Sequence, residues 1–268
     1  MKPHIINAKF DVYGMIGNPV SQTQTPALFN TYCSENNYPA VMVPLKISAA
    51  RELDHLLSMM KNSKFLSGFV STIPFKADLY HRCQQPGPAA SILKKVNAVK
   101  ISPSGEVVGE MFDGIGFIKA LKSKNFLFPN KNCLVIGCGA AGQAIAVELK
   151  RCGILTCSVI DTDMSALNRF RKVISEKSEN YKFETKAPKD LSNFDLIINA
   201  SPLGMFLDDQ LPGDLDTLKP GSYVGDCVTN FDETNFLKMA KAKGAITVSG
   251  ADMAKGQLSS ILDFFGIT

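Results

Sequence analysis

The chain has 268 residues, a length that suggests about two domains. Apolar residues make up 45% and charged residues 20%, which excludes a disordered chain. The 29 Lys and Arg against 25 Asp and Glu are spread along the sequence, so no nucleic-acid partner is predicted, and no apolar run approaches the ~20 residues that a membrane span needs.

The cysteine and histidine patterns indicate a chain without disulfides or a metal site. The seven cysteines include no C-x-x-C pair, and the three histidines include no H-x-x-x-H pair. Reduced thiols are typical of a reducing compartment, and zinc sites need clustered ligands. We therefore expect a cytoplasmic protein that binds no metal. A Ser-His-Asp hydrolase is not supported either, because no G-x-S-x-G motif is present.

The first half of the chain alternates short apolar strands with helical patterns. The helical patterns begin at Pro26, at Ser48, which would cap its helix, and at Pro74. A hairpin is predicted around Ser104-Gly105. The strands are expected at 12–16, 40–45, 65–71, 97–101 and 107–111.

The second half repeats this alternation with longer spacing. Strands separated by helices of 10–15 residues predict βαβ units and a mainly parallel sheet. The expected strands are 133–136, 158–160, 196–199, 223–228 and 245–248, and the expected helices are 117–122, 141–150, 165–176 and 253–265.

A glycine-rich loop between the strand 133–136 and the following helix is the clearest chemical signal. It has the pattern G-x-G-x-x-G, formed by Gly137, Gly139 and Gly142. In such loops the glycines allow a tight turn, close approach of a pyrophosphate and close helix–strand packing. The helix start at Ala140 and Ala141 would offer backbone N–H groups to the phosphates. We therefore predict dinucleotide binding at these five residues.

Asp161 ends the next strand, roughly 20 residues after the loop, where dinucleotide-binding proteins place the acidic residue that binds the adenosine ribose. This predicts NAD as the cofactor in preference to NADP, because Asp161 and Asp163 would repel a 2′-phosphate. Asp161 is also in position to cap the next helix, and the two roles are compatible.

Lys76 and Asp113 are the residues of the first half whose positions suggest chemistry. Lys76 falls in the predicted first turn of a helix, where the helix dipole disfavours a cation, a position that suggests an acid/base lysine. Asp113 lies at the junction of the two alternating series, where a cleft between domains would hold a ligand. From these positions alone, an ordinary surface lysine and a turn aspartate remain open alternatives.

Several segments resemble, in the same order, the motifs of the shikimate dehydrogenase family, over essentially the whole chain. They include Gly17-Asn18-Pro19 with Thr23-x-Thr25-Pro26, Thr72-x-Pro74-Phe75-Lys76, Asn97 with Asp113-Gly114-x-Gly116-Phe117, the loop Gly137–Gly142, Asn199-Ala200-Ser201 with Gly204-Met205, and Gly250-x-x-Met253 with Gln257.

The resemblance implies reversible, NAD(P)-dependent oxidation of shikimate to 3-dehydroshikimate. It assigns Lys76 as the acid/base that takes the hydroxyl proton and Asp113 as its partner. It further implies that Thr23 and Thr25 bind the substrate carboxylate and that Thr72, Asn97 and Gln257 bind ring hydroxyls. It places Ser201, Met205, Val228 and Gly250 against the cofactor.

The chain departs from the family pattern mainly around the substrate. Threonines replace serines at 23 and 25, and an Asn-Arg-Thr common in NADP-dependent members is Asp161-Thr162-Asp163 here. The other departures are Gln22, Val70, Ala98, Met111, Phe112 and Thr229. Three readings stay open: an NAD-linked dehydrogenase for shikimate or a relative such as quinate, an oxidoreductase for another small hydroxylated carboxylate, and a nucleotide sensor without turnover.

The resemblance also implies an α/β architecture of two domains with a cleft between them. The substrate domain would comprise residues 1–112 plus 249–268, because Gln257 must reach the substrate. The Rossmann-type cofactor domain, with a parallel sheet, would comprise residues 113–248. The protein would be a monomer or a homodimer.

Overall fold

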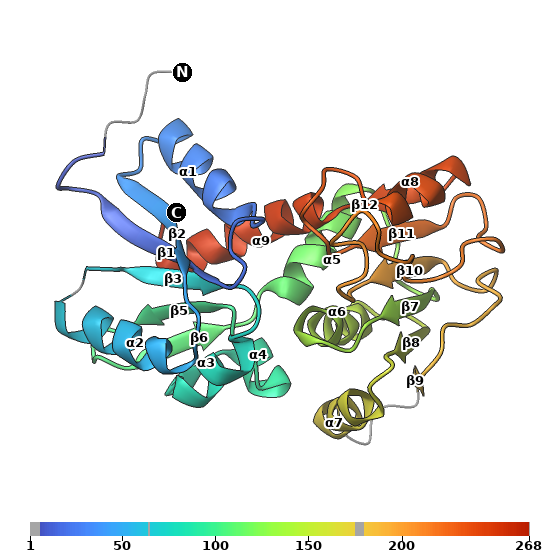
Figure 1. Ribbon diagram of the computed structural model, residues 1–268, viewed down its shortest axis with the longest axis horizontal. Coiled ribbons are helices and arrows are strands. Elements are labelled where there is room, and N and C mark those ends of the chain that lie inside the picture. Colours follow the sequence, from blue (N-terminus) through green and yellow to red (C-terminus); the bar gives the residue numbers. More distant parts are fainter. Residues whose placement is uncertain (1–5, 64, 175–179, 268) are drawn as a thin grey trace. The chain divides into compact units, whose positions relative to one another are not determined.

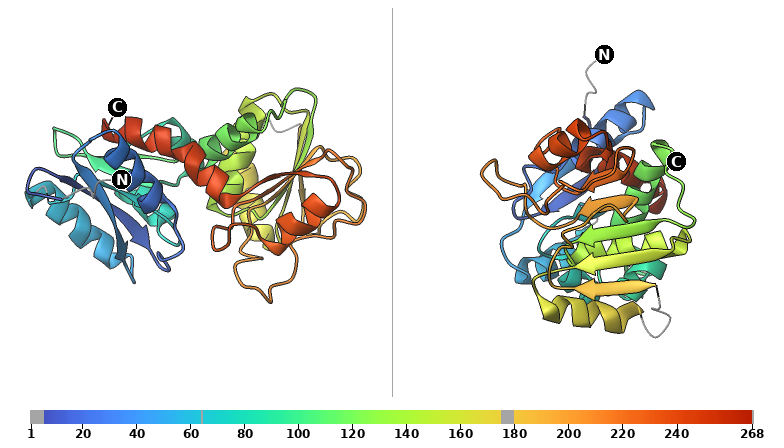
Figure 2. Two further views of the ribbon diagram at one scale, coloured as in Figure 1. Left: turned by 90° about the horizontal axis from the view of Figure 1, so that it is seen from above. Right: turned by 90° about the vertical axis from the view of Figure 1, so that its right-hand side faces the viewer.

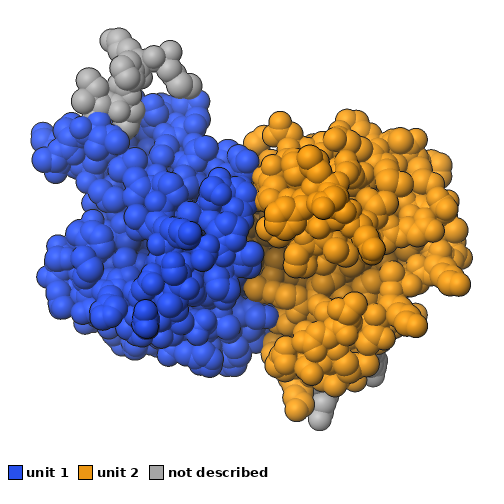
Figure 3. All heavy atoms as spheres, viewed as in Figure 1, with its two compact units in different colours: residues 1–112, 258–268 blue, residues 113–257 orange. Residues whose placement is uncertain are grey.

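The structure is a computed structural model that describes residues 6–63, 65–174 and 180–267 (Figure 1). It divides into two compact units, one formed by Met1–Phe112 with Leu258–Thr268 and the other by Asp113–Gln257 (Figure 3). Residues 249–257, which the sequence assigns to the first domain, contact the second unit instead. The α/β fold class is confirmed.

The first unit contains a mixed sheet. Within the described residues this sheet has six strands in the order β2-β1-β3-β5-β6-β4. β1 pairs in parallel with β2 and β3, whereas β5 and β6 form the predicted antiparallel hairpin. The strands are β1 (Asp11–Gly17), β2 (Ala40–Lys46), β3 (Gly68–Ser71), β4 (Gln85–Pro86), β5 (Ala98–Ile101) and β6 (Val107–Glu110).

Helices of the first unit follow the apolar positions of the sequence. The helix expected from Ser48 begins at Arg51 instead, and the backbone N–H of Ser48 donates to Glu52 (3.0 Å). A core cluster joins Tyr13 and Met42 of the sheet to Phe29 and to Ile261 near the C-terminus. The helices are α1 (Thr25–Glu35), α2 (Arg51–Ser63), α3 (Lys76–Arg82) and α4 (Pro88–Leu93).

The second unit contains a parallel sheet of the Rossmann type. Its six described strands have the order β12-β11-β10-β7-β8-β9, and every pairing among them is parallel. The order reverses between β7 and β10, the switch point at which such sheets bind dinucleotides. The strands are β7 (Asn132–Ile136), β8 (Thr156–Ile160), β9 (Tyr181–Glu184), β10 (Leu196–Asn199), β11 (Tyr223–Asp226) and β12 (Ile246–Val248).

Helices cover both faces of this sheet (Figure 2). α6 packs on β7 and β8, whereas α8 packs on β11 and β12. A core cluster buries Ile197 and Val224 of the sheet against Phe236 and Leu237 of α8. The helices are α5 (Asp113–Ser123), α6 (Ala140–Arg151), α7 (Met164–Ile174), α8 (Asn235–Ala242) and α9 (Gly250–Phe265).

Four of these elements are not predicted from the sequence: β4, α4, β9 and α8. β9 is an edge strand with only partial burial, so its apolar signal is weak. α8 does carry a start signal, since the side chain of Thr234 accepts a hydrogen bond from Leu237 N–H (3.3 Å). Of the helix expected at 165–176, residues 175 and 176 lie outside the described residues.

Candidate active site

The glycine-rich loop joins β7 to α6, as predicted. Gly137 has a φ of +101°, which side chains other than glycine adopt rarely. A Cβ atom at Gly142 would lie 1.9 Å from the carbonyl oxygen of Gly137. These two glycines are therefore required by the conformation of the loop and by its packing against the helix.

Gly139 has a different explanation. Its φ of −75° suits any residue, and a Cβ atom there would meet no protein atom within 4 Å. No protein atom therefore occupies the space beside this residue, where a pyrophosphate would bind. α6 starts here at Ala140 and Ala141 without a side-chain cap, so its first N–H groups are directed at the same space. The loop fits a dinucleotide.

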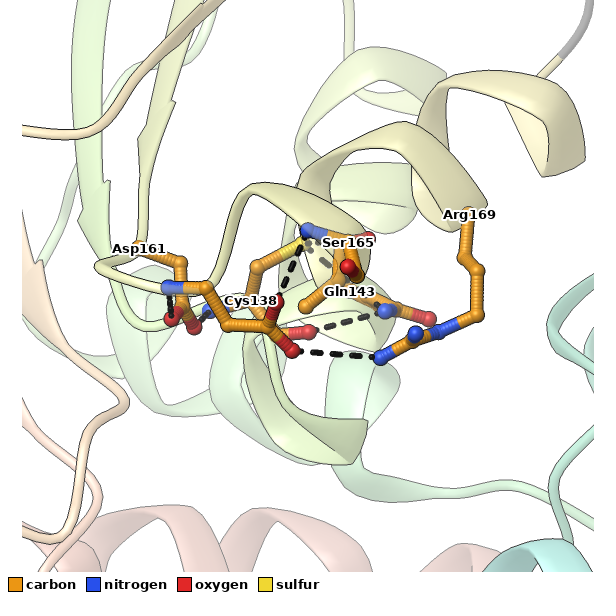
Figure 4. A network of polar contacts seen from close by, with 7 residues as sticks. Cys138, Gln143, Asp161, Ser165 and Arg169 are labelled. Atoms are coloured by element: carbon orange, nitrogen blue, oxygen red, sulfur yellow. Dashed lines mark hydrogen bonds and ion pairs between the residues drawn. The ribbon is translucent and has the colours of Figure 1, made fainter.

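Asp161 holds the glycine-rich loop through both oxygens of its carboxylate. Its Oδ2 accepts a hydrogen bond from the backbone N–H of Cys138 (2.7 Å), and its Oδ1 accepts one from Asp163 N–H (2.9 Å) (Figure 4). Asp163, rather than Asp161, caps α7, because its side chain accepts from Ser165 N–H (2.8 Å). This bond lowers the pKa of Asp163. Arg169 pairs with Asp163 at 3.4 Å on the exposed surface.

Gln143 fixes the other side of the same peptide. This side chain of α6 is buried, and its Nε2 donates to the carbonyl oxygen of Cys138 (2.8 Å). The Cys138 residue is therefore held at its N–H by Asp161 and at its C=O by Gln143 (Figure 4). Sequence analysis did not select Gln143, although a glutamine on the apolar face of a helix is an available signal.

The loop after β10 is organised by Asn199, which is buried. Asn199 Oδ1 accepts from both the N–H (3.0 Å) and the hydroxyl (2.6 Å) of Ser201. Its Nδ2 donates to the carbonyl oxygen of Leu203 (2.8 Å). Asn230 then ties the next loop to this one by donating to the carbonyl oxygen of Met205 (2.9 Å). Ser201 and Met205 thus lie on one tightly held loop at the carboxyl end of the sheet.

Asp226 lies beneath these loops at the end of β11, fully buried. Its Oδ1 accepts from Asn199 Nδ2 and from Val228 N–H, both at 3.0 Å, and its Oδ2 accepts from the hydroxyl of Thr234 at 2.7 Å. Burial raises the pKa of this carboxyl to about 6, against the hydrogen bonds, which lower it. The sequence analysis did not identify Asp226.

Val228 and Gly250 meet at the far side of the same sheet. A Cβ atom at Gly250 would lie 2.3 Å from the carbonyl oxygen of Val228, so only glycine allows α9 to begin here. The side-chain methyl group of Thr229 would lie 2.8 Å from that Cβ. Ser201, Met205, Val228 and Gly250, which the family resemblance places against the cofactor, therefore all lie on loops at the carboxyl ends of β10 and β11 or at the start of α9.

Asp113 and Gln257 are brought together within the second unit. Asp113 is buried at the start of α5, and Gln257 Nε2 of α9 donates to its Oδ1 (3.3 Å). The two helices approach closely because both contact residues are glycines: a Cβ atom at Gly116 would lie 2.2 Å from Gln257 Cγ, and one at Gly256 would lie 2.1 Å from Gly116 O. This close packing also explains why residues 249–257 belong to the second unit.

Lys76 belongs to the first unit. It lies in the first turn of α3, as the sequence predicts, but this helix begins at Lys76 itself and not at Pro74, and Lys76 is half-buried. Its backbone carbonyl accepts a hydrogen bond from Val96 N–H (2.9 Å), which fixes the start of the helix against the segment that precedes β5.

The predicted substrate threonines lie after β3 and in the segment from β1 to the start of α1, all in the first unit. Thr72 follows β3, and a Cβ atom at Gly17 would lie 2.2 Å from Thr72 Cγ2, so a glycine at the end of β1 admits this side chain. The hydroxyl of Thr23 donates to the carbonyl oxygen of Val20 (2.9 Å). Thr25 is the first residue of α1.

The side-chain oxygen of Asn97 has a structural role, because it accepts a hydrogen bond from the backbone of Phe112. Asn97 is buried, and its Oδ1 accepts from Phe112 N–H (2.8 Å). The Phe112 ring packs edge-on against Phe264, with centroids 5.6 Å apart.

Val70 lies in the core beside Met15 and is 2% exposed. Val70 therefore contributes to the core of the first unit.

The described residues show neither a metal site nor a membrane-spanning helix. Among residues 6–63, 65–174 and 180–267, no three His, Cys, Asp or Glu side chains gather as a metal site would require. None of the helices in these ranges is long and apolar enough to cross a membrane.

The doubly wound sheet, its glycine-rich loop and the open space at Gly139 define a dinucleotide-binding protein of the Rossmann class. Residues 15–99 match the family model of the shikimate dehydrogenase substrate binding domain. Shikimate dehydrogenase (NADP(+)) of Methanococcus maripaludis is 31% identical over 257 residues, covering 93% of this chain and 89% of the relative. The chain belongs to the shikimate dehydrogenase family, whose members are NAD(P)-dependent oxidoreductases acting on CH–OH groups.

Solved structures agree over almost the whole chain. A shikimate dehydrogenase in complex with NADP+ is 28% identical with a TM-score of 0.89, covering 97% of this chain and 91% of that one. Quinate dehydrogenase from Corynebacterium glutamicum in complex with NAD is 26% identical with a TM-score of 0.82, covering 95% of this chain and 93% of that one. The cofactor is therefore a nicotinamide dinucleotide.

Proposed function

We propose that the protein is a dehydrogenase that reversibly oxidises a hydroxyl of shikimate, or of a close relative such as quinate, with NAD as the preferred cofactor. The observation that carries this proposal is the presence of Lys76 and Asp113 at the positions of the family motifs, on a chain whose second unit fits a dinucleotide. A chain that had become only a nucleotide sensor would have no need of this pair.

In the proposed mechanism Lys76 and Asp113 act on the same substrate hydroxyl. Lys76 takes the hydroxyl proton as general base, and Asp113 orients the hydroxyl and the lysine. The bound nicotinamide supplies the hydride acceptor. The C–H and O–H bonds of the alcohol are thus exchanged for a C=O bond, and in the reverse direction Lys76 returns the proton.

Substrate binding is proposed at five residues. The hydroxyl of Thr25 donates to the substrate carboxylate, and that of Thr23 does so by turning away from the carbonyl oxygen of Val20, to which it donates in this structure. Thr72, Asn97 and Gln257 bind ring hydroxyls. The hydrogen bond from Gln257 to Asp113 supports its part, because it links a substrate-binding amide to the catalytic carboxylate.

The preference for NAD is proposed from Asp161 and Asp163. A 2′-phosphate bound beside the ribose would face two carboxylates, and at an effective dielectric of 20 a like-charge pair at 4 Å costs about 4 kcal/mol. Half of that value separates the two cofactors by more than about tenfold. The pairing of Arg169 with Asp163 offsets part of this repulsion.

A second candidate function is oxidation of another small hydroxylated carboxylate, with little activity on shikimate. Two observations favour keeping it. Phe112 and Thr229 replace residues typical of the substrate and nicotinamide regions of the family, and the similar quinate dehydrogenase was solved with NAD.

The test is a matrix of initial rates followed by NADH or NADPH absorbance. Shikimate, quinate and related polyol acids are each combined with NAD and with NADP, and kcat/KM is compared. We expect turnover of shikimate or quinate, with NAD at least about tenfold better than NADP. A preference for NADP would contradict the argument from Asp161. Tight dinucleotide binding without turnover of any acid would favour the nucleotide sensor.

A further inference from the structure

Asp226 is a buried anion without a protein cation. It is 0% exposed, and its three hydrogen-bond donors, from Asn199, Val228 and Thr234, are all neutral. Within the described ranges, no Lys, Arg or His forms an ion pair with it within 4.0 Å. Burial of an uncompensated charge opposes folding. A residue that is kept despite such an effect is a candidate for a functional role.

The position of Asp226 indicates which half of a bound dinucleotide lies closer to it. A Rossmann sheet consists of two mononucleotide-binding halves, and the glycine-rich loop with Asp161 belongs to the half formed by β7, β8 and β9. Asp226 ends β11 in the other half, formed by β10, β11 and β12. This second half receives the nicotinamide mononucleotide.

The hydrogen bonds of Asp226 reach the loops that form this half of the site. Through Asn199 it is connected to Ser201 and to the carbonyl of Leu203, and it binds Val228 N–H directly. Removal of the carboxylate would therefore loosen both loops together.

The charge of Asp226 has a second consequence. The oxidised nicotinamide ring is a cation, whereas the reduced ring is neutral, so a buried carboxylate beneath this half stabilises the oxidised form. We propose that Asp226 positions the nicotinamide loops and that its negative charge shifts the relative affinity of the site toward the oxidised cofactor. This proposal rests on the proposed function, because it requires that the site bind a nicotinamide dinucleotide.

Asp226→Asn separates the charge from the hydrogen bonds. The two fixed N–H donors both meet Oδ1, which the asparagine oxygen replaces, and only the rotatable hydroxyl of Thr234 meets Oδ2. That hydroxyl can turn and accept a hydrogen bond from the new amide nitrogen, because a hydroxyl both donates and accepts. The variant therefore keeps the two hydrogen bonds at Oδ1 and the contact with Thr234, and it loses the charge.

The experiment compares dissociation constants of NAD+ and NADH for the wild-type protein and Asp226→Asn at pH 8, by calorimetry and by NADH fluorescence; NADP+ and NADPH are used if the wild type binds them more tightly. We expect the ratio of the NAD+ to the NADH dissociation constant to rise on the order of tenfold in the variant, as for one charge pair across ~10 Å at an effective dielectric of 20. A tenfold change equals about 30 mV in the midpoint potential of the bound cofactor.

Thr234→Val is the matched control, since it removes the two hydrogen bonds of the Thr234 hydroxyl, to Asp226 Oδ2 and from Leu237 N–H, and retains the carboxylate. We expect it to weaken NAD+ and NADH binding by the same factor, so that the ratio stays at the wild-type value. Equal weakening of both forms by Asp226→Asn, or a changed ratio in Thr234→Val, would overturn the proposal about charge. If the wild-type protein binds neither redox form, the proposed function itself fails and this proposal fails with it.

Discussion

The buried carboxyl of Asp226 makes the stability of the protein depend on pH in an unusual direction. Its pKa is about 6 in the folded protein and 3.8 in its ordinary, exposed state. The folded protein therefore binds a proton more tightly than the unfolded chain does. Ionised Asp226 destabilises the fold above pH 6, and this destabilisation is relieved as the pH falls toward 4.

The size of the effect follows from the difference between the two pKa values. About two pKa units correspond to about 3 kcal/mol, because one unit is 1.36 kcal/mol. Asp226→Asn, which cannot ionise, should raise the free energy of unfolding by up to about 3 kcal/mol at pH 8. For a unit of about this size that corresponds to an increase in Tm of roughly 6–12 °C.

Urea or thermal unfolding of both proteins at pH 8, 7, 6 and 5 measures this. The stabilisation of Asp226→Asn should be largest and nearly equal at pH 8 and 7, and it should decrease from pH 6 to pH 5, because the folded-state pKa is about 6. Asp208→Asn serves as the control, because Asp208 is exposed, and it should behave as the wild type at every pH. The reasoning is refuted if Asp226→Asn is less stable than the wild type by the same amount at all four values.

Three other substitutions test the site. Gly139→Val places a side chain in open space, so Tm should stay unchanged while NADH affinity, measured by fluorescence, falls at least about tenfold; equal affinity would show that no phosphate approaches this residue. Gln143→Leu leaves the carbonyl of Cys138 without its donor and should lower the free energy of unfolding by about 1–3 kcal/mol in urea; an unchanged value would mean that water replaces the amide. Lys76→Ala should reduce kcat by roughly 10²–10⁴-fold with little change in KM, and Lys61→Ala, on an exposed face, should not; wild-type kcat would remove Lys76 from the mechanism.

The fold of the second unit was predictable because its signals are local. The strand 196–199 is a continuous apolar run, and the loop 137–142 combines an apolar strand with glycines at fixed spacing. Two elements of the first unit could not be predicted, since β4 has two residues and α4 six, too short for either period to appear.

The network around Asp226 could not be predicted from the sequence. Its members come from the end of β10, the end of β11 and the start of α8, and no periodic pattern connects residues 199, 226 and 234. Only the parallel pairing of β10 with β11, in which Asn199 lies beside Asp226, brings the first two together. Hydrogen-bond partners of this kind depend on strand register, which is a property of the folded sheet.

The hydrogen bonds of Asp161 decide which substitution can test the choice between NAD and NADP. Both of its oxygens already accept backbone N–H groups, and each retains a lone pair for a ribose hydroxyl. An Asp161→Asn substitution would turn one of these acceptors into a donor and disturb the glycine-rich loop. Its effect on cofactor preference could then not be separated from its effect on the conformation of the loop. Thr162 is exposed and lies between the two carboxylates without a part in this network. Thr162→Arg should therefore raise kcat/KM for NADP relative to NAD by at least about tenfold, by adding a cation near the 2′-position. An unchanged ratio in steady-state kinetics would mean that the 2′-position lies away from the loop between β8 and α7.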